Sequence, residues 1–179
     1  MPKKLSHYDG SGRARMVDVS GKSATKREAE ASAFVAIRPE VLALLPSNPK
    51  GDPLEVARIA GILAAKRTSE WIPLCHPLLL TYIDVYPRVC KNGVEIRTQV
   101  TAAAQTGVEM EALVAAAAAA LTVYDMCKAL DKGIEIQDVF LLKKTGGKSG
   151  DFFREGRIPT KHRKAGKSQE GSARFTKSS

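Results

Sequence analysis

Two charged side chains downstream of an alanine-rich segment have the types and spacing of an acid/base pair. Asp125 and Lys128 are three residues apart, so they lie on the same face if this segment is helical. A carboxylate beside an ammonium group alters the protonation of both, and such a pair can move protons in a reaction. The alternative is an ordinary surface ion pair, which is the commoner meaning of this spacing.

A cysteine and a histidine occur together between two prolines. Pro73 and Pro77 restrict the backbone around Cys75 and His76, and apolar residues surround the imidazole in the sequence. Neighbouring residues of an extended chain point to opposite sides, which makes this a poor metal chelate and a poor thiolate–imidazole pair. The alternative is a loop histidine beside a buried cysteine. With only three histidines in the chain, no Cys/His cluster has zinc spacing, and we expect no metal.

The segment 142–151 combines glycines with lysines. Glycines allow backbone N–H groups to surround an anion, and the lysines add positive charge. The segment is not a Walker A motif, because the template ending at Lys148 and Ser149 requires a glycine where this chain has Leu142. The open alternatives are a phosphate-binding loop and a flexible exit loop. Lys50–Asp52, ahead of a predicted helix, is a shorter segment of the same kind.

The elements that must position these residues follow from hydrophobic periodicity and turn residues. Residues 25–37 would also suit a helix, but the alternation and the proline that follows favour a strand. Lys143–Gly150 is predicted as a loop. Leaving out one short helix, the order is β-α-β-β-α-β, the ferredoxin-like arrangement of an α+β domain, with an antiparallel sheet and both helices on one face. The predicted strands cover 25–37, 78–86, 94–100 and 134–142, and the predicted helices cover 39–45, 52–70 and 108–130.

The second long helix separates its own polar ends. Glu109 and Asp125 are 16 positions apart, which in a straight helix is roughly 24 Å along the axis and about 160° around it. One small ligand cannot contact both from the same chain, so a second subunit must complete the site if both ends are functional. The alanine run 115–120 leaves two alternatives: close packing on the sheet, or contact with a helix of another subunit.

Length and composition limit the class of protein. The 179 residues are 44% hydrophobic and 26% charged, as in a soluble domain with a core. No apolar run reaches the length of a membrane span, the N-terminus lacks the apolar stretch of a signal peptide, and the three cysteines indicate reduced thiols in a cytoplasm. Six of the nine net positive charges lie in a tail too poor in apolar residues to fold. We therefore expect an N-terminal arm (1–21), an α+β domain (22–155) and a disordered basic tail (156–179).

Seven motifs, in order and at consistent spacing, resemble one family. They are MVDVS at 16–20, KGD at 50–52, ARIAGILAAKRT at 57–68, IPLCHPL at 72–78, TGVEMEAL at 106–113, LTVYDMCKA at 121–129 and GGKSGDF at 146–152. Together they resemble molybdenum cofactor biosynthesis protein C, the family of the cyclic pyranopterin monophosphate synthases.

The resemblance implies a ferredoxin-like α+β fold and a homohexamer, a trimer of dimers, with active sites at subunit interfaces. It implies a lyase that converts 3′,8-cyclo-7,8-dihydro-GTP into cyclic pyranopterin monophosphate and releases diphosphate, without a metal or organic cofactor. Carried over by motif, Asp125 is the catalytic acid/base residue and Lys128 is the lysine beside it. We expect a cytoplasmic enzyme with a small-molecule substrate and no membrane or nucleic-acid partner. The substrate-binding positions carried over are Lys50, Leu74, Cys75, His76, Glu109, Met110, Glu111 and Lys144.

Two features depart from the family pattern. Pro53 and Leu54 follow KGD where aliphatic or small residues are more common, and the second long helix is unusually rich in alanine. The rival hypothesis is a basic nucleic-acid-binding module, which the net charge of +9 suggests. It is weakened because most of this charge lies in the tail and few aromatic residues are available to stack on bases. A catalytically silent scaffold is disfavoured because Asp125, Lys128 and His76 are all retained.

Overall fold

A computed structural model of the chain describes residues 7–155. The predicted basic tail, 156–179, lies outside the described residues, as do residues 1–6. In chain order, the elements are β1 (Thr25–Ala36), α1 (Pro39–Leu42), the 3-10 helix η1 (Leu45–Ser47), α2 (Pro53–Lys66), α3 (Thr68–Trp71), β2 (Leu80–Cys90), β3 (Gly93–Ala104), α4 (Glu109–Cys127), β4 (Glu135–Thr145) and β5 (Phe152–Phe153).

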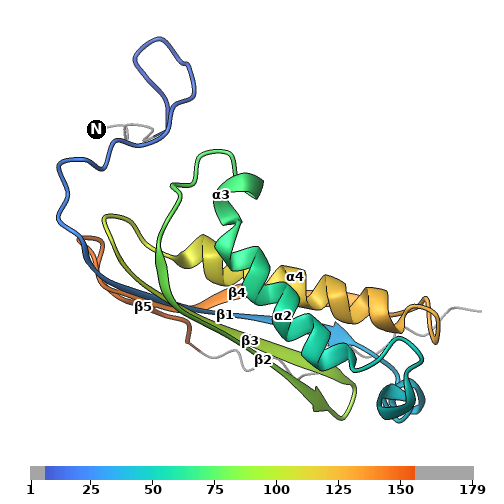
Figure 1. Ribbon diagram of the computed structural model, residues 1–179. Coiled ribbons are helices and arrows are strands. Elements are labelled where there is room, and N and C mark those ends of the chain that lie inside the picture. The colour runs from blue at the N-terminus through green and yellow to red at the C-terminus, as the bar shows by residue number, and fades with distance from the viewer. Residues whose placement is uncertain (1–6, 156–179) are drawn as a thin grey trace, which may run out of the picture.

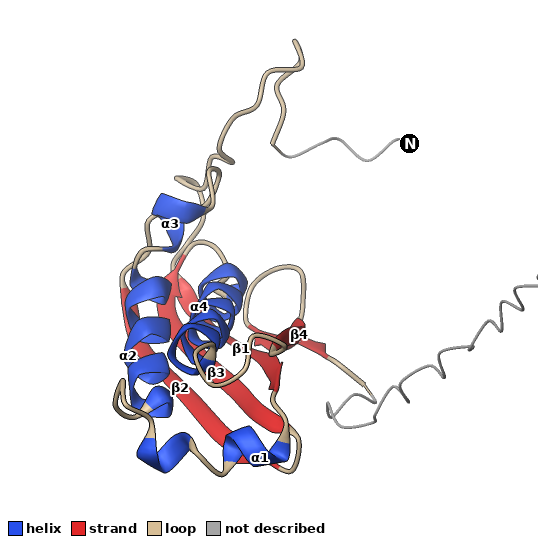
Figure 2. Cartoon of the chain, turned by 90° about the vertical axis from the view of Figure 1, so that its right-hand side faces the viewer, coloured by secondary structure: helices blue, strands red, loops and turns tan. Residues whose placement is uncertain are grey.

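The five strands form one antiparallel sheet in the order β2-β3-β1-β4-β5. Figures 1 and 2 show α2 and α4 on the same face of this sheet. Without β5, the order is that of a split β-α-β, in which β3 lies between β2 and β1. The predicted ferredoxin-like α+β fold is therefore confirmed.

Several predicted boundaries were wrong. The strands predicted over 78–86 and 94–100 extend to Cys90 and Ala104, and the short helix predicted over 39–45 ends at Leu42, before a separate 3-10 helix. The helix predicted over 52–70 is two helices, because Arg67 leaves the helical backbone region (φ −115°, ψ 17°) between α2 and α3. The long helix ends at Cys127 rather than near residue 130. The loop predicted to begin at Lys143 begins only after Thr145, because Lys143 and Lys144 continue β4 by pairing with β1 on one side and β5 on the other.

The N-terminus of α2 forms as the sequence predicts. Asp52 is the N-cap, and its Oδ1 accepts hydrogen bonds from the backbone N–H groups of Leu54 at 2.8 Å and Glu55 at 3.3 Å. Pro53 occupies the first helical position, where a missing N–H costs no hydrogen bond. The departure from the family pattern at Pro53 thus fits a regular helix start.

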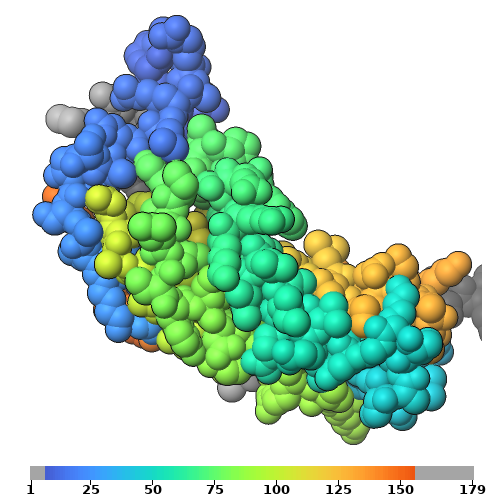
Figure 3. Space-filling view, in the orientation of Figure 1, coloured from blue at the N-terminus to red at the C-terminus, as the bar shows by residue number. Residues whose placement is uncertain are grey.

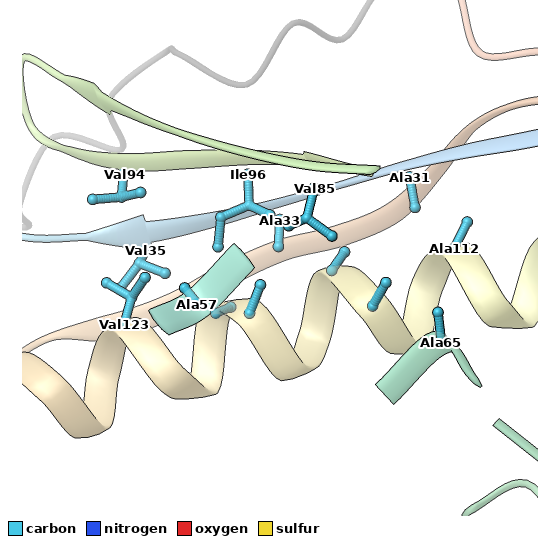
Figure 4. Close-up of a cluster of buried hydrophobic side chains, with 14 of the residues drawn as sticks. Ala31, Ala33, Val35, Ala57, Ala65, Val85, Val94, Ile96, Ala112 and Val123 are labelled. Atoms are coloured by element: carbon cyan, nitrogen blue, oxygen red, sulfur yellow. The ribbon is translucent and has the colours of Figure 1, made fainter. Parts of the chain in front are cut away.

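Small side chains bring the helices close to the sheet and to each other. Alternate residues of β1, from Ala29 to Val35, are fully buried on the helix side, and Val35 meets Val123 of α4 there (Figure 4). A Cβ on Gly61 of α2 would lie 2.9 Å from the carbonyl oxygen of Ala115, so α2 and α4 are in near backbone contact. Close packing within the chain, one of the two alternatives for the alanine run, is therefore realised.

Burial explains the apolar character of α4. Among the helices of residues 7–155, α4 has the length and hydropathy (1.4) that a membrane span would need. This apolar stretch is 61% buried inside the domain, where α4 packs on the sheet beside α2 (Figure 2). The helix is thus accounted for as the core helix of the fold.

Candidate active site

An ion-pair cluster lies at the C-terminal end of α4. The Nζ of Lys128 is 2.6 Å from Oδ1 of Asp125, and the Nζ of Lys50 lies 3.5 Å from Oδ2. These side chains are 41–56% exposed. Lys128, and then Lys50, hold the pKa of Asp125 below its ordinary value, while Asp125 raises the pKa of Lys128. The cluster therefore presents an ionised carboxylate between two ammonium groups at neutral pH.

A cavity of about 370 Å³ lies at the opposite end of α4. Four of the predicted residues line it: Leu74, Cys75 and His76 from the segment after α3, and Glu111 from the first turns of α4. The Nε2 of His76 donates to the carbonyl oxygen of Val17 at 2.8 Å, which ties the N-terminal arm to this segment. Figure 3 shows the arm, in blue, beside the green segment that contains α3.

Burial sets the protonation of two groups in this cavity. Glu111 is only 4% exposed, and burial, with the charge of Glu109 adding to it, raises its pKa to about 7. Burial also raises the pKa of Cys75, and Glu111 adds to the effect. At neutral pH, Glu111 is therefore able to give or take a proton, whereas Cys75 is a thiol that forms part of the wall.

The remaining predicted residues lie near the same end of α4. The Nζ of Lys144 is 3.5 Å from Oε1 of Glu109 and 2.7 Å from the hydroxyl oxygen of Ser149. This places the loop after β4 beside the first turn of α4. Met110 is half-buried and does not line the cavity.

The structure thus divides the predicted residues into two groups. Helix α4 runs without a break from Glu109 to Cys127. Glu111 and Asp125 are 14 positions apart on it, which corresponds to about 21 Å along the axis. Within one chain, the carboxylate–ammonium cluster and the cavity are therefore separate.

The sequence analysis missed the contribution of the arm. His7, Val17, Val19 and Lys22 also line the cavity, and all four precede β1. The available signal was the motif at 16–20, which the resemblance had already singled out. Nothing in its residue types indicated that a backbone carbonyl at Val17 would hold an imidazole.

Comparison with known proteins identifies the family. The model of the MoaC family matches residues 16–147, a range that contains every predicted site residue. This chain belongs to the MoaC family. The resemblance drawn from the seven motifs is thereby confirmed.

Three relatives match this MoaC family member over nearly their whole length. The cyclic pyranopterin monophosphate synthase of Roseiflexus sp. is 54% identical over 155 residues, covering 84% of this chain and 98% of the relative. The protein of the same name from Chloroflexus aggregans is 54% identical over 156 residues, covering 85% and 94%. That from Pelotomaculum thermopropionicum is 55% identical over 156 residues, covering 85% and 92%.

Proposed function

We propose that this MoaC family member is a cyclic pyranopterin monophosphate synthase, a lyase of molybdenum cofactor biosynthesis. Its small-molecule substrate is 3′,8-cyclo-7,8-dihydro-GTP, and its products are cyclic pyranopterin monophosphate and diphosphate. Relatives at 54–55% identity carry the name of this activity. The observation that carries the proposal is the cluster of Asp125, Lys50 and Lys128 within the region that matches the family.

Asp125 and Lys128 supply the proton transfers. Rearrangement of the guanine-derived ring requires protons to move to and from nitrogen and carbon atoms. Because two ammonium groups keep Asp125 ionised, its carboxylate acts first as a base, and Lys128, at 2.6 Å, stabilises that charge and can return a proton. Positioned acid/base groups contribute about 10²–10⁴-fold each.

The lysines also serve the phosphate chemistry. Closing the cyclic monophosphate forms a bond from a substrate hydroxyl oxygen to the innermost phosphorus and breaks the bond from that phosphorus to the oxygen of the leaving diphosphate. Lys144, near the end of β4, supplies an ammonium group beside the turn at Gly146 and Gly147, whose φ angles are 85° and 92°. The N–H of Gly146 donates to Asp151 within this turn, so the charge of Lys144 is the phosphate-binding feature that we propose here. Positive charge here stabilises the charge that develops on the leaving group.

The cavity binds the ring system. Leu74 and Cys75 form an apolar wall, while His76 and the buried Glu111 are its polar groups. With Glu109 and Met110 beside them at the start of α4, these residues fix the orientation of the substrate. The pKa of Glu111, about 7, allows it to exchange a proton with the bound ring.

Each active site is shared between two copies of the chain. The separation along α4 prevents one copy from bringing Asp125 to the cavity that contains Glu111. The outer face of α2 exposes Val56, Ile59 and Leu63, each 40–52% accessible, an apolar stripe that suits contact with another copy. The assembly we propose is a homohexamer, a trimer of dimers, in which one copy supplies the cavity and another the Asp125 cluster.

The reaction needs no metal or organic cofactor, since acid/base groups and cations suffice for each step. Its proposed location is the cytoplasm. Cys75, Cys90 and Cys127 are all free thiols, which fits a reducing compartment.

Incubation with the cyclic dihydro-GTP substrate tests the function. We expect the protein to release diphosphate and to form the pyranopterin product. Asp125→Asn keeps the size of the side chain but removes the base, and turnover should fall by about 10²–10⁴-fold while the assembly stays intact. Glu135→Gln, an exposed carboxylate on β4, is the matched control and should leave turnover unchanged. A wild-type protein that produces no diphosphate would overturn the proposal.

A further inference from the structure

A buried asparagine connects the loop that carries Lys50 to the helix that carries Asp125. Asn48 is 9% exposed. Its Nδ2 donates to the carbonyl oxygen of Met126 at 3.0 Å, and its Oδ1 accepts from the backbone N–H of Lys50 at 2.9 Å. One side chain thus bridges the two segments that build the ion-pair cluster.

The end of α4 explains why this bridge forms. The last carbonyl groups of a helix have no partner within the helix. In α4, Asn48 satisfies the carbonyl of Met126, and the Nζ of Lys50 donates to the carbonyl of Asp125 at 2.9 Å. Two side chains from one short loop therefore cap the helix at neighbouring positions.

The loop itself is a tight turn. The N–H of Gly51 donates to the carbonyl of Asn48 at 3.0 Å, Pro49 holds the second position, and Gly51 has φ 94°. Asparagine, proline and glycine are the types that such a turn prefers at these places. The turn fixes the backbone of Lys50, and the Nδ2 bond of Asn48 attaches the first position of the turn to α4.

We propose that Asn48 is a positioning residue of the reaction, which holds Lys50 against Asp125 by docking the turn on the end of α4. This inference rests on the proposed function of the Lys50–Asp125–Lys128 cluster. Lys50 is 41% exposed, and its Nζ contacts on α4 are the carbonyl oxygen of Asp125 at 2.9 Å and the carboxylate at 3.5 Å. Both contacts depend on where the turn lies against the end of α4. Asn48 acts through Lys50, because its own polar groups are committed to Met126 and to the Lys50 backbone.

A double-mutant cycle tests this coupling. Asn48→Ser retains an oxygen for the Lys50 N–H but cannot reach the carbonyl of Met126. We expect kcat/KM to fall about 10-fold in this variant, and by less than about twofold when the same change is made in Lys50→Ala, where nothing remains to be positioned. Ser47→Ala removes an exposed hydroxyl that donates to the carbonyl oxygen of Leu44, away from α4, and should leave kcat/KM unchanged. An equal loss in both backgrounds would show that Asn48 acts on stability alone and overturn the proposal.

Chemical labelling gives a readout that needs no turnover. In Asn48→Ser, acylation of the Lys50 amine by an amine-reactive ester should become several-fold faster, because the side chain spends more time away from Asp125, while labelling of the exposed Lys91 stays the same. Mass spectrometry of the two peptides measures both rates. Unchanged labelling of Lys50 would overturn the inference, whereas absence of diphosphate release by the wild-type protein would overturn only the proposed function.

Discussion

Mixing two inactive variants offers a quantitative test of the shared active site. Asp125→Asn removes the base at one end of α4, and Glu111→Gln removes the buried carboxyl group of the cavity at the other. The two positions are 14 residues apart on one unbroken helix, about 21 Å along its axis. A pocket for one small molecule cannot include both from the same copy, so the proposed function requires each site to take one residue from each of two copies.

The expected recovery follows from chance. The two variants are mixed equally, unfolded and reassembled together. In half of the resulting sites, the copy that supplies position 125 carries the wild-type Asp125. Independently, in half of the sites the copy that supplies position 111 carries the wild-type Glu111. About one quarter of the wild-type rate of diphosphate release should therefore return, although each variant alone is nearly inactive.

A matched control uses both substitutions on one chain, mixed equally with wild-type protein. Shared sites again retain about one quarter of the activity, whereas sites within single copies would retain about one half. Mass spectrometry of the intact assemblies verifies that the copies have mixed. No recovery from the two single variants, in assemblies shown to contain both, would refute the argument from helix length.

Three further predictions concern stability and substrate capture. Because the pKa of Glu111 is about 7 in the folded protein against 4.5 ordinarily, the folded state keeps a proton that the unfolded state has lost between these values. The free energy of unfolding should therefore fall by about 3 kcal/mol as pH rises from 4.5 to 7. Urea denaturation across this pH range should show that Glu111→Gln removes most of this pH dependence of the unfolding free energy. If the unfolding free energies of the variant and the wild type fell equally with pH, the raised pKa of Glu111 would be contradicted. Lys144→Ala should raise KM for the triphosphate substrate, with less dependence on salt than in the wild type; an unaltered KM at low ionic strength would exclude a phosphate contact. Gly61→Ala should cost about 1–3 kcal/mol despite the better helix propensity of alanine, since its Cβ would lie 2.9 Å from the Ala115 carbonyl oxygen. An unchanged denaturation midpoint would show that α2 can shift at no cost.

Local patterns were sufficient to predict most of the elements. Asp52 followed by Pro53 marks a helix start by its hydrogen-bonding chemistry alone, and the structure places both as expected. The boundary error at the end of β4 has a non-local cause. Lys143 and Lys144 sit in a glycine-rich segment, yet they are strand residues because β1 and β5 pair with them from either side. No property of the segment itself reveals these partners.

For the candidate site, spacing alone predicted that Asp125 and Lys128 would be neighbours, because a helix fixes the distance between residues three apart. It also predicted that the ends of α4 would be remote from each other, since a helix has a fixed rise per residue. Only the tertiary structure revealed that Asn48 and Lys50 cap the end of α4, and that the arm closes on His76 through a backbone carbonyl. These contacts join residues 59–78 positions apart in the chain, where no periodicity relates the partners. The raised pKa of Glu111 also depended on the tertiary structure, because it results from burial by residues that come together only when the domain folds.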